Sequence, residues 1–226
     1  MELDSLYEGI MIRGIDSVRK QKEYVDHHID DMADTRMGIT LVIRPTAEIN
    51  ERISRMEEEL RKIEPEQYYY PQEDYHITLL DILTARQGFA YTKEQVSTCR
   101  QLSEEVIRRA KPFTIHLKGI VLSEGAVMVK GYYENEMEHL RRHLREAIIN
   151  YGMQLDERYP TNSSHVTIAR FRTEIKLREQ LIDKISEYKE LEIGTFPVSQ
   201  IDLICHNWYD SKKEVLSSFL IGRPQR

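Results

Sequence analysis

The sequence predicts an α+β fold in which two similar lobes of mainly antiparallel sheet, with flanking helices, face each other across a central groove. The first observation behind this prediction is that helical and strand-like patterns alternate along all 226 residues without a low-complexity linker. The second is a repeated tetrapeptide, His-apolar-Thr-apolar, at residues 76–79 and again at 165–168. The offset is constant (165 − 76 and 167 − 78 both equal 89), which suits two lobes related by a pseudo-twofold axis.

The N-terminal part of the chain predicts helix, strand and helix. Apolar residues at an imperfect helical spacing indicate one or two helices within residues 5–32. A strand is predicted at 37–43, and Pro45 ends it because proline cannot donate a ladder hydrogen bond. Thr46 is placed to cap the following helix, which runs to about residue 63.

The two histidine-containing segments are predicted to be strands that each follow a loop. Residues 67–74 hold three tyrosines and a proline, and this loop leads into the first such strand at 75–83. A loop around 160–162 precedes the second, at 164–171. The remaining predicted elements are a loop at 84–91, helices at 92–110, 135–151 and 175–188, and strands at 112–120, 126–133, 196–206 and 215–221, with a hairpin turn at 123–125.

Composition is typical of a soluble globular protein, with 31% charged and 40% hydrophobic residues. No apolar run approaches the length of a transmembrane helix, and the first residues lack the pattern of a secretory signal. The two cysteines, Cys99 and Cys205, are too few for a disulfide framework. The sequence therefore predicts a cytoplasmic protein that does not associate with membranes. We expect a monomer, although no feature of the sequence indicates an oligomeric state.

The net charge of −6 disfavours nonspecific coating of duplex nucleic acid. Residues 1–34 hold nine acidic and four basic side chains, a balance of −5, which leaves −1 for the rest of the chain. A nearly neutral body is compatible with a local basic groove and with a substrate that carries phosphate.

The repeated tetrapeptide predicts a site with two imidazoles. Successive side chains of a strand point to opposite faces, so His76 and Thr78 share one face, as do His165 and Thr167, while the apolar residues face the core. The reference pKa of histidine, about 6.5, suits both a general base and a general acid near neutral pH. Two such residues are able to divide these two roles between them.

These residues resemble a known family. The tetrapeptides HITL and HVTI are similar to the two signature motifs of the 2H phosphoesterase superfamily, which includes 2′-5′ RNA ligase-like proteins and cyclic phosphodiesterases. The resemblance extends over roughly residues 38–223 and includes the strand at 39–45, the hairpin at 115–129 and Ala169-Arg170. It therefore implies an acidic helical extension at 1–36 and a 2H phosphoesterase-like domain at 37–226.

The resemblance implies a bilobal fold and chemistry on phosphodiesters that requires neither metal nor cofactor. By position in the motifs, it identifies His76 and His165 as the catalytic acid and base, without showing which is which. Thr78 and Thr167 then bind the nonbridging phosphate oxygens. The implied partner is an RNA end or nucleotide with a 2′,3′-cyclic phosphate or a 2′-5′ linkage, and the same site run in reverse is a 2′-5′ ligase.

Other candidate residues lie near the motifs. Arg170 is a candidate for phosphate binding, although ideal strand alternation turns it away from His165. Tyr70 and Tyr75 precede the first motif, where a base could stack on them, and packing is the alternative. Candidates for the groove wall are Phe89 and Tyr91, and the remaining histidines are read as surface or structural residues, namely His27, His28, His116, His139, His143 and His206.

Three alternatives stay open at this point. The substrate could be a small cyclic phosphate, such as a cyclic nucleotide or an ADP-ribose derivative. A binding module from a different functional class would hold an RNA end without turning it over. The acidic residues 1–34 could also bind a protein partner.

Overall fold

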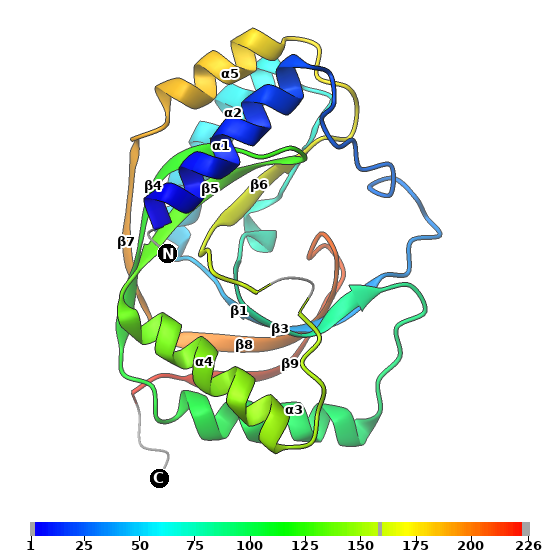
Figure 1. Cartoon of the computed structure of the whole chain (residues 1–226), viewed down its shortest axis with the longest axis vertical. Coiled ribbons are helices and arrows are strands. Elements are labelled where there is room, and N and C mark those ends of the chain that lie inside the picture. Colours follow the sequence, from blue (N-terminus) through cyan, green and yellow to red (C-terminus); the bar gives the residue numbers. More distant parts are fainter. Residues whose placement is uncertain (1–2, 158–159, 223–226) are drawn as a thin grey trace.

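The strands form one curled sheet whose two halves face each other (Figure 1). Side chains from both halves line a hollow between them. The structure is a computed structural model that describes residues 3–157 and 160–222. Its elements are α1 (Leu3–Arg19), β1 (Met37–Ile43), α2 (Ala47–Ile63), β2 (Tyr68–Tyr69), the 3-10 turn η1 (Gln72–Asp74), β3 (Ile77–Arg86), α3 (Lys93–Ile107), β4 (Phe113–Leu122), β5 (Ala126–Tyr133), α4 (Asn135–Asn150), β6 (Val166–Arg170), α5 (Arg178–Glu187), β7 (Glu192–Val198), β8 (Gln200–Asn207) and β9 (Lys213–Leu220).

The strand order divides the sheet at its middle. It runs β7-β4-β5-β6-β3-β1-β8-β9, and the strands named here pair only in antiparallel fashion. Helices α1, α2 and α5 cover the half that contains β6, while α3 and α4 cover the half that contains β3 (Figure 1). The two histidine strands are thus central neighbours, and each has the same arrangement of strands beyond it. This confirms the predicted α+β class and its antiparallel, two-lobed organisation.

Local sequence accounts for the elements that were predicted well. In α2, Ile49, Ile53, Met56 and Leu60 repeat at helical spacing and are all buried. The side chain of Thr46 accepts a hydrogen bond from the amide of Ile49, as expected of an N-cap. The spacing and the cap therefore fix both the buried face and the start of this helix.

Two differences from the sequence prediction concern strands that exchange partners. Tyr68 and Tyr69 form β2 inside the predicted loop 67–74. Strand β3 pairs with β6 only through Ile77 and Val166, so the rest of this edge of β6 is free to pair with β2. The single strand predicted at 196–206 is two strands divided at Ser199. The chain crosses there from one half of the sheet to the other, since β7 pairs with β4 while β8 pairs with β1.

The N-terminal segment contains a single helix in its described part, followed by a loop over residues 20–36. Helix α1 lies very close to β4, because a Cβ atom on Gly14 would stand 2.1 Å from the carbonyl oxygen of Leu122. The loop is attached by the amides of Tyr24 and Asp26, which donate to the carbonyls of Glu124 and Phe171. No helix within the described ranges has the length and hydropathy that a membrane span requires.

Candidate active site

The two tetrapeptides meet at the centre of the sheet. Ile77 of β3 pairs with Val166 of β6, and both side chains are completely buried. These are the residues between His and Thr in each motif, so the two histidines and two threonines lie on the opposite face, toward the hollow. In this antiparallel register the His of each motif lies across from the Thr of the other.

A bulge in each histidine strand places one more residue on the same face. Between Thr40↔Asp81 and Val42↔Thr78 the register of β3 slips by one residue, and both Leu79 and Leu80 are buried. The aspartate therefore returns to the side of the histidine despite its odd spacing from Thr78.

The same slip occurs in β6, where Ala126 pairs with Arg170 and Met128 with Thr167. The two bulged positions keep the offset of the motifs, since 170 − 81 is again 89. Arg170 thus faces the hollow, which ideal strand alternation did not predict.

His76 is held in a defined orientation and ring form. Its Nδ1 donates to the carbonyl oxygen of Asp74 at 2.8 Å, which leaves Nε2 as the nitrogen available to the hollow. An oxygen of the Asp210 carboxylate lies 3.8 Å from the same Nδ1. Burial lowers the pKa of His76 to about 4, while the Asp210 charge acts in the opposite direction.

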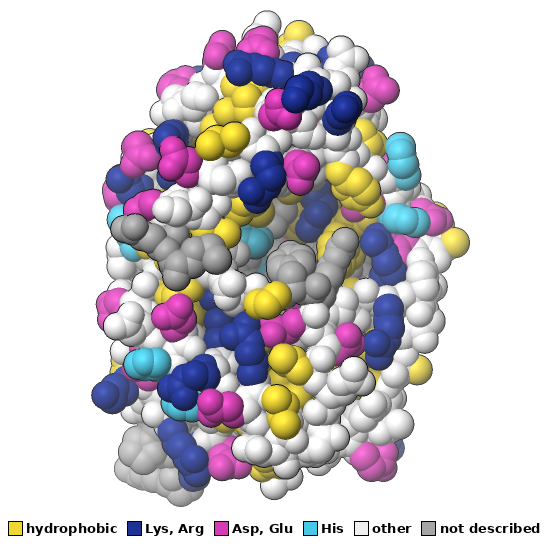
Figure 2. All heavy atoms as spheres, in the orientation of Figure 1, with side chains coloured by type: hydrophobic (Ala, Val, Ile, Leu, Met, Phe, Trp, Pro, Cys, Tyr) yellow, Lys and Arg dark blue, Asp and Glu magenta, His cyan; other side chains and the backbone are white. Residues whose placement is uncertain are grey.

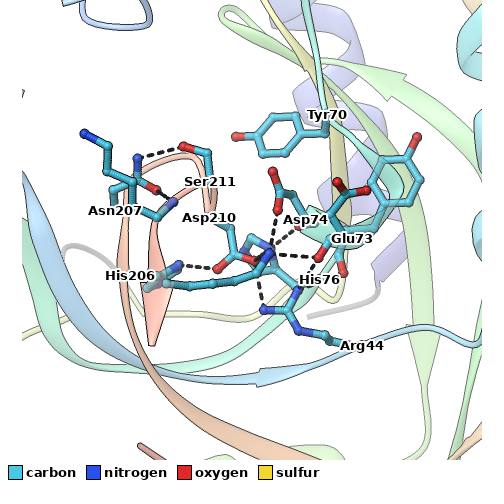
Figure 3. A network of polar contacts seen from close by, with 12 residues as sticks. Arg44, Tyr70, Glu73, Asp74, His76, His206, Asn207, Asp210 and Ser211 are labelled. Carbon is cyan, nitrogen blue, oxygen red and sulfur yellow. Dashed lines mark hydrogen bonds and ion pairs between the residues drawn. The ribbon is translucent and has the colours of Figure 1, made fainter. Parts of the chain in front are cut away.

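Asp210 is the centre of a buried charge network that also contains a third histidine (Figure 3). His206 donates from Nδ1 to one carboxylate oxygen at 2.8 Å, and Arg44 and Lys213 contact the other at 2.8 and 3.0 Å. Burial alone would raise the pKa of Asp210, but the His206 hydrogen bond and the surrounding positive charges hold it below its usual range. Its backbone φ of 59° is a conformation that Asp adopts more readily than most residues.

The surroundings of His165 are different, because the charged groups that act on it are cations. Its Nδ1 lies 2.7 Å from the hydroxyl of Ser163. Burial lowers the pKa of His165 to about 4, and the charges of Arg170, His76 and Arg141 add to this effect. The imidazole at this position is therefore favoured in its neutral form.

Arg141 of α4 joins the backbones of the two motifs. Its guanidinium donates to the carbonyls of Thr78 and Leu79 at 3.0 and 2.8 Å, and to the carbonyl of Ser163 at 2.6 Å. The side chain is 1% exposed. A rigid planar donor that bonds to β3 and to the loop just before His165 restrains the spacing between the two histidines.

The catalytic candidates line one small cavity of about 120 Å³. Its walls hold His76, Thr78, His165, Thr167 and Arg170, together with Thr40, Tyr70, Asp81, Thr84, Ala85, Thr161, Ser163, His206, Asn207 and Trp208. Arg170 donates from Nε to the hydroxyl of Tyr70 at 2.8 Å. Burial raises the pKa of Asp81, against a hydrogen bond that its carboxylate accepts from Thr40.

A larger cavity of about 630 Å³ continues outward from the small one and shares His165, Thr167 and Arg170 with it. Figure 2 shows the hollow near the middle of one face, with histidine and cationic side chains visible inside it. We refer to the two spaces as the inner and the outer cavity. Together they form the candidate active-site groove.

Some of the weaker sequence candidates lie elsewhere. Tyr75 is 1% exposed and donates to Glu57 on α2 at 2.6 Å. Contrary to the prediction, it therefore does not reach the groove. Phe89 and Tyr91 stack loosely on each other, 5.9 Å between ring centroids, and line neither cavity. They therefore do not form the predicted groove wall. Of these aromatic candidates Tyr70 does line the inner cavity.

Sequence reasoning missed several residues of the site, among them Asp210, His206, Asp81 and Arg141. His206 was assigned a structural role, yet it lines the inner cavity and lies 5.7 Å from His76, ring to ring. Asp81 was not considered, although the two consecutive apolar residues before it are a signal for a bulge. Arg141 was not identified as a site residue, although it occupies a helical position between the buried Met137 and Leu144.

The described residues contain no group of three or more His, Cys, Asp or Glu side chains arranged to hold a metal ion. His139 and His143, one turn apart on α4, line a separate surface groove against α3. These two histidines therefore belong to neither cavity of the candidate site.

Comparison with known proteins gives a consistent result. The family model described as the 2′-5′ RNA ligase superfamily matches residues 45–208, and no curated protein matches significantly. Among solved structures, TT0787 of Thermus thermophilus has 16% identity and a TM-score of 0.61, over 83% of this chain and 98% of its own. Escherichia coli LigT in apo form has 15% identity and a TM-score of 0.60, over 84% and 100%.

A structure of E. coli LigT complexed with 3′-AMP is similar to the same degree. It has 15% identity and a TM-score of 0.59, over 83% of this chain and 99% of its own. At such low identity these similarities establish the fold, including the curled sheet around the groove.

Proposed function

Because this chain belongs to the 2′-5′ RNA ligase superfamily, as the resemblance of its motifs to the 2H phosphoesterases predicts, we propose that it is a metal-independent phosphodiesterase. Its substrate is a 2′,3′-cyclic phosphate or a 2′-5′ phosphodiester of an RNA end or nucleotide. The observation that carries the proposal is the arrangement around the Ile77–Val166 pair, which brings two oriented imidazoles and two hydroxyls to one cavity.

Electrostatics divide the roles of the two histidines. Burial disfavours the charged form of both imidazoles, but at His76 the Asp210 carboxylate and the Asp74 carbonyl act in the opposite direction. His165 has Arg170 and Arg141 as charged neighbours, and these disfavour its protonation. His165 is therefore the general base and His76 the general acid.

The reaction follows from this assignment. His165 accepts a proton from water as the water oxygen bonds to phosphorus, and Thr78 and Thr167 donate to the nonbridging oxygens as negative charge grows there. The bond from phosphorus to one ribose oxygen breaks, and that oxygen takes a proton from His76. The products are a phosphomonoester and a free hydroxyl, and the reverse sequence joins two such groups into a 2′-5′ linkage with release of water.

One property of the groove and one of a fold-related protein support a nucleotide substrate. The net charge of the protein is −6, yet the inner cavity holds Arg170, with its guanidinium lying over the Trp208 ring at 5.5 Å. A fold-related protein, E. coli LigT, has structures complexed with 3′-AMP and with phosphate. A protein of this fold therefore accommodates nucleotide and phosphate groups.

The test measures hydrolysis of a panel in EDTA, with phosphorus NMR to identify the products. The panel holds an oligonucleotide ended by a 2′,3′-cyclic phosphate, a free 2′,3′-cyclic nucleotide, a 2′-5′-linked dinucleotide and an ADP-ribose that carries a cyclic phosphate. His76→Ala and His165→Ala are each expected to lower kcat by about 10²–10⁴-fold. His143→Ala, an exposed histidine of α4, is the matched control and should keep wild-type activity.

The outcomes separate the functional classes. EDTA-resistant turnover that both variants lose supports the two-histidine mechanism, and the preferred substrate identifies the substrate class. Binding of these ligands by the folded wild-type protein without turnover would overturn the proposal in favour of a binding module.

A further inference from the structure

The outer cavity is walled on one side by the N-terminal segment. Helix α1 presents Leu6, Ile10 and Arg13 to it, at the i, i+4 and i+7 positions of one helix face. Tyr24 and Arg36 of the following loop also line it. The family match begins at residue 45, so this wall lies outside the part of the chain that the family model matches.

The size of the inner cavity requires that a nucleotide extend beyond it. At about 120 Å³ it holds the reacting phosphate and part of a ribose, since sites for small organic ligands occupy about 300–1,000 Å³. The outer cavity, at about 630 Å³, is continuous with it through His165, Thr167 and Arg170. An RNA chain that extends from the reacting phosphate into the outer cavity therefore passes along the N-terminal wall.

The charge of the outer cavity fits a second phosphate. Among the residues that the structure describes, its lining holds Arg13, Arg36 and Arg170 against one acidic residue, Glu124. Arg36 is held by Asp34, 2.7 Å away, and Arg170 by the hydroxyl of Tyr70. Arg13 is exposed and makes no side-chain ion pair or hydrogen bond with any residue in the ranges 3–157 and 160–222. Of the described cations of this wall, Arg13 is therefore the one available to a ligand.

Aromatic surfaces lie beside these charges. The Tyr24 ring is 56% exposed at the mouth of the cavity, where its backbone is anchored to the hairpin between β4 and β5. The guanidinium groups of Arg36 and Arg170 lie over the Trp208 ring, 5.6 and 5.5 Å from its centroid. Flat aromatic and guanidinium surfaces beside a cation are typical of sites that stack bases and bind the phosphate backbone.

The wall is preformed rather than loosely attached. The close approach of Gly14 to Leu122 fixes α1 on the sheet, and the buried hydroxyl of Tyr7 bonds to the backbone of Gly131. The loop is held where the Tyr209 hydroxyl donates to the buried carboxylate of Asp26 at 2.9 Å. Little ordering of this segment is needed when a ligand binds.

We propose that the N-terminal segment forms a second nucleotide subsite, in which Arg13 binds the phosphate on the 5′ side of the terminal nucleotide. This inference rests on the proposed function, and it names the substrate class as an RNA end of two or more nucleotides rather than a free cyclic nucleotide. The wall adds substrate selectivity to a site whose chemistry is performed by the part of the fold that the family model matches.

The test compares kcat/KM for a dinucleotide ended by a 2′,3′-cyclic phosphate with kcat/KM for the corresponding cyclic mononucleotide. The wild-type protein is expected to prefer the dinucleotide. Arg13→Gln should lower the ratio of the two values by about tenfold, the scale of one charge-assisted contact, and Arg13→Glu should lower it further. Arg55→Gln, a charge-matched change at a 78% exposed side chain of α2, should leave the ratio at its wild-type value.

The outcomes distinguish this inference from the proposed function. Equal kcat/KM for the two substrates in the wild type, or a ratio that Arg13→Gln does not change, overturns the subsite and leaves the phosphodiesterase standing. If the wild type hydrolyses neither substrate, the proposed function fails and the inference fails with it. An equal fall in the ratio for Arg55→Gln also overturns it, because the effect is then one of overall charge.

Discussion

The phenol oxygen of Tyr7, in the N-terminal helix, lies 3.3 Å from the backbone amide of Ser164, the residue immediately before His165. The same oxygen accepts from the amide of Gly131 at 3.1 Å and donates to its carbonyl at 2.9 Å. There is no room for a side chain between these backbones, because a Cβ on Gly131 would stand 1.9 Å from the carbonyl oxygen of Ser164. Tyr7 therefore connects α1 to the approach of the second motif.

Tyr7→Phe is expected to lower the free energy of unfolding by about 1–3 kcal/mol, because it leaves buried amides without their acceptor. Urea denaturation measures this change. The matched control is Tyr132→Phe, which removes an exposed hydroxyl bonded to Asp4 and should cost less than about 1 kcal/mol. If Tyr7→Phe lost no more free energy of unfolding relative to the wild type than Tyr132→Phe, the Tyr7 contacts would not support the fold.

The sequence predicted the helices, most strands and the four motif residues, because these depend on local periodicity. It did not predict the bulges, since ideal alternation was assumed beyond Thr78 and Thr167. Each bulge is marked in the sequence by two consecutive apolar residues, Leu79-Leu80 and Ile168-Ala169, and both members of each pair are buried. Recognising them would have placed both Asp81 and Arg170 in the groove.

Other parts of the site depend on distant pairing. The Asp210 carboxylate, in the turn between β8 and β9, lies 3.8 Å from Nδ1 of His76, which is 134 residues earlier in the sequence (210 − 76). The outer wall likewise arises from contact between residues far apart in sequence, such as Tyr24 and Glu124. No local pattern in the sequence encodes such contacts. The acidic balance of residues 1–34 therefore gave no indication that Arg13 of this segment lines the groove.

Replacement of either motif threonine by valine tests the proposed phosphate contacts. Thr78→Val and Thr167→Val keep the shape of the side chain and its β-branched preference for a strand, but they remove the hydroxyl donor. Each is expected to lower kcat by about 10–10³-fold, with little change in thermal unfolding because both side chains face the cavity. Steady-state kinetics and calorimetry on the same samples check this, and a wild-type kcat in either variant would exclude that threonine from transition-state binding.

Asp210→Asn tests the division of roles between the histidines. Its carboxylate favours protonated His76, so its loss lowers the pKa of that imidazole further. A general acid with a lower pKa loses its proton at lower pH, and the alkaline limb of the kcat/KM profile therefore moves to lower pH. The acid limb, which the proposed base His165 sets, should stay in place.

The measurement is kcat/KM over a series of buffers from acid to alkaline pH. Asp202→Asn on the same sheet changes a carboxylate that bonds to Gln200, and it should leave both limbs unchanged. A shift of the acid limb in Asp210→Asn would reverse the assignment and make His76 the base.

Arg141→Lys separates the need for a positive charge from the need for a planar donor. Lysine keeps the charge, but a single ammonium group cannot reproduce the geometry that reaches Thr78, Leu79 and Ser163 together. Buried carbonyls are then left without donors, and we expect unfolding to become easier by about 1–3 kcal/mol. Because the two backbones also lose their common partner, kcat should fall more than KM rises.

Urea denaturation and steady-state kinetics on Arg141→Lys measure the two effects separately. The adjacent Arg142→Lys makes the same chemical change at an exposed side chain whose partner is Glu146, and it should preserve both stability and kcat. If Arg141→Lys lowered stability but retained wild-type kcat at a temperature where it is fully folded, the spacing of the two histidines would be set by the Ile77–Val166 pair without help from α4.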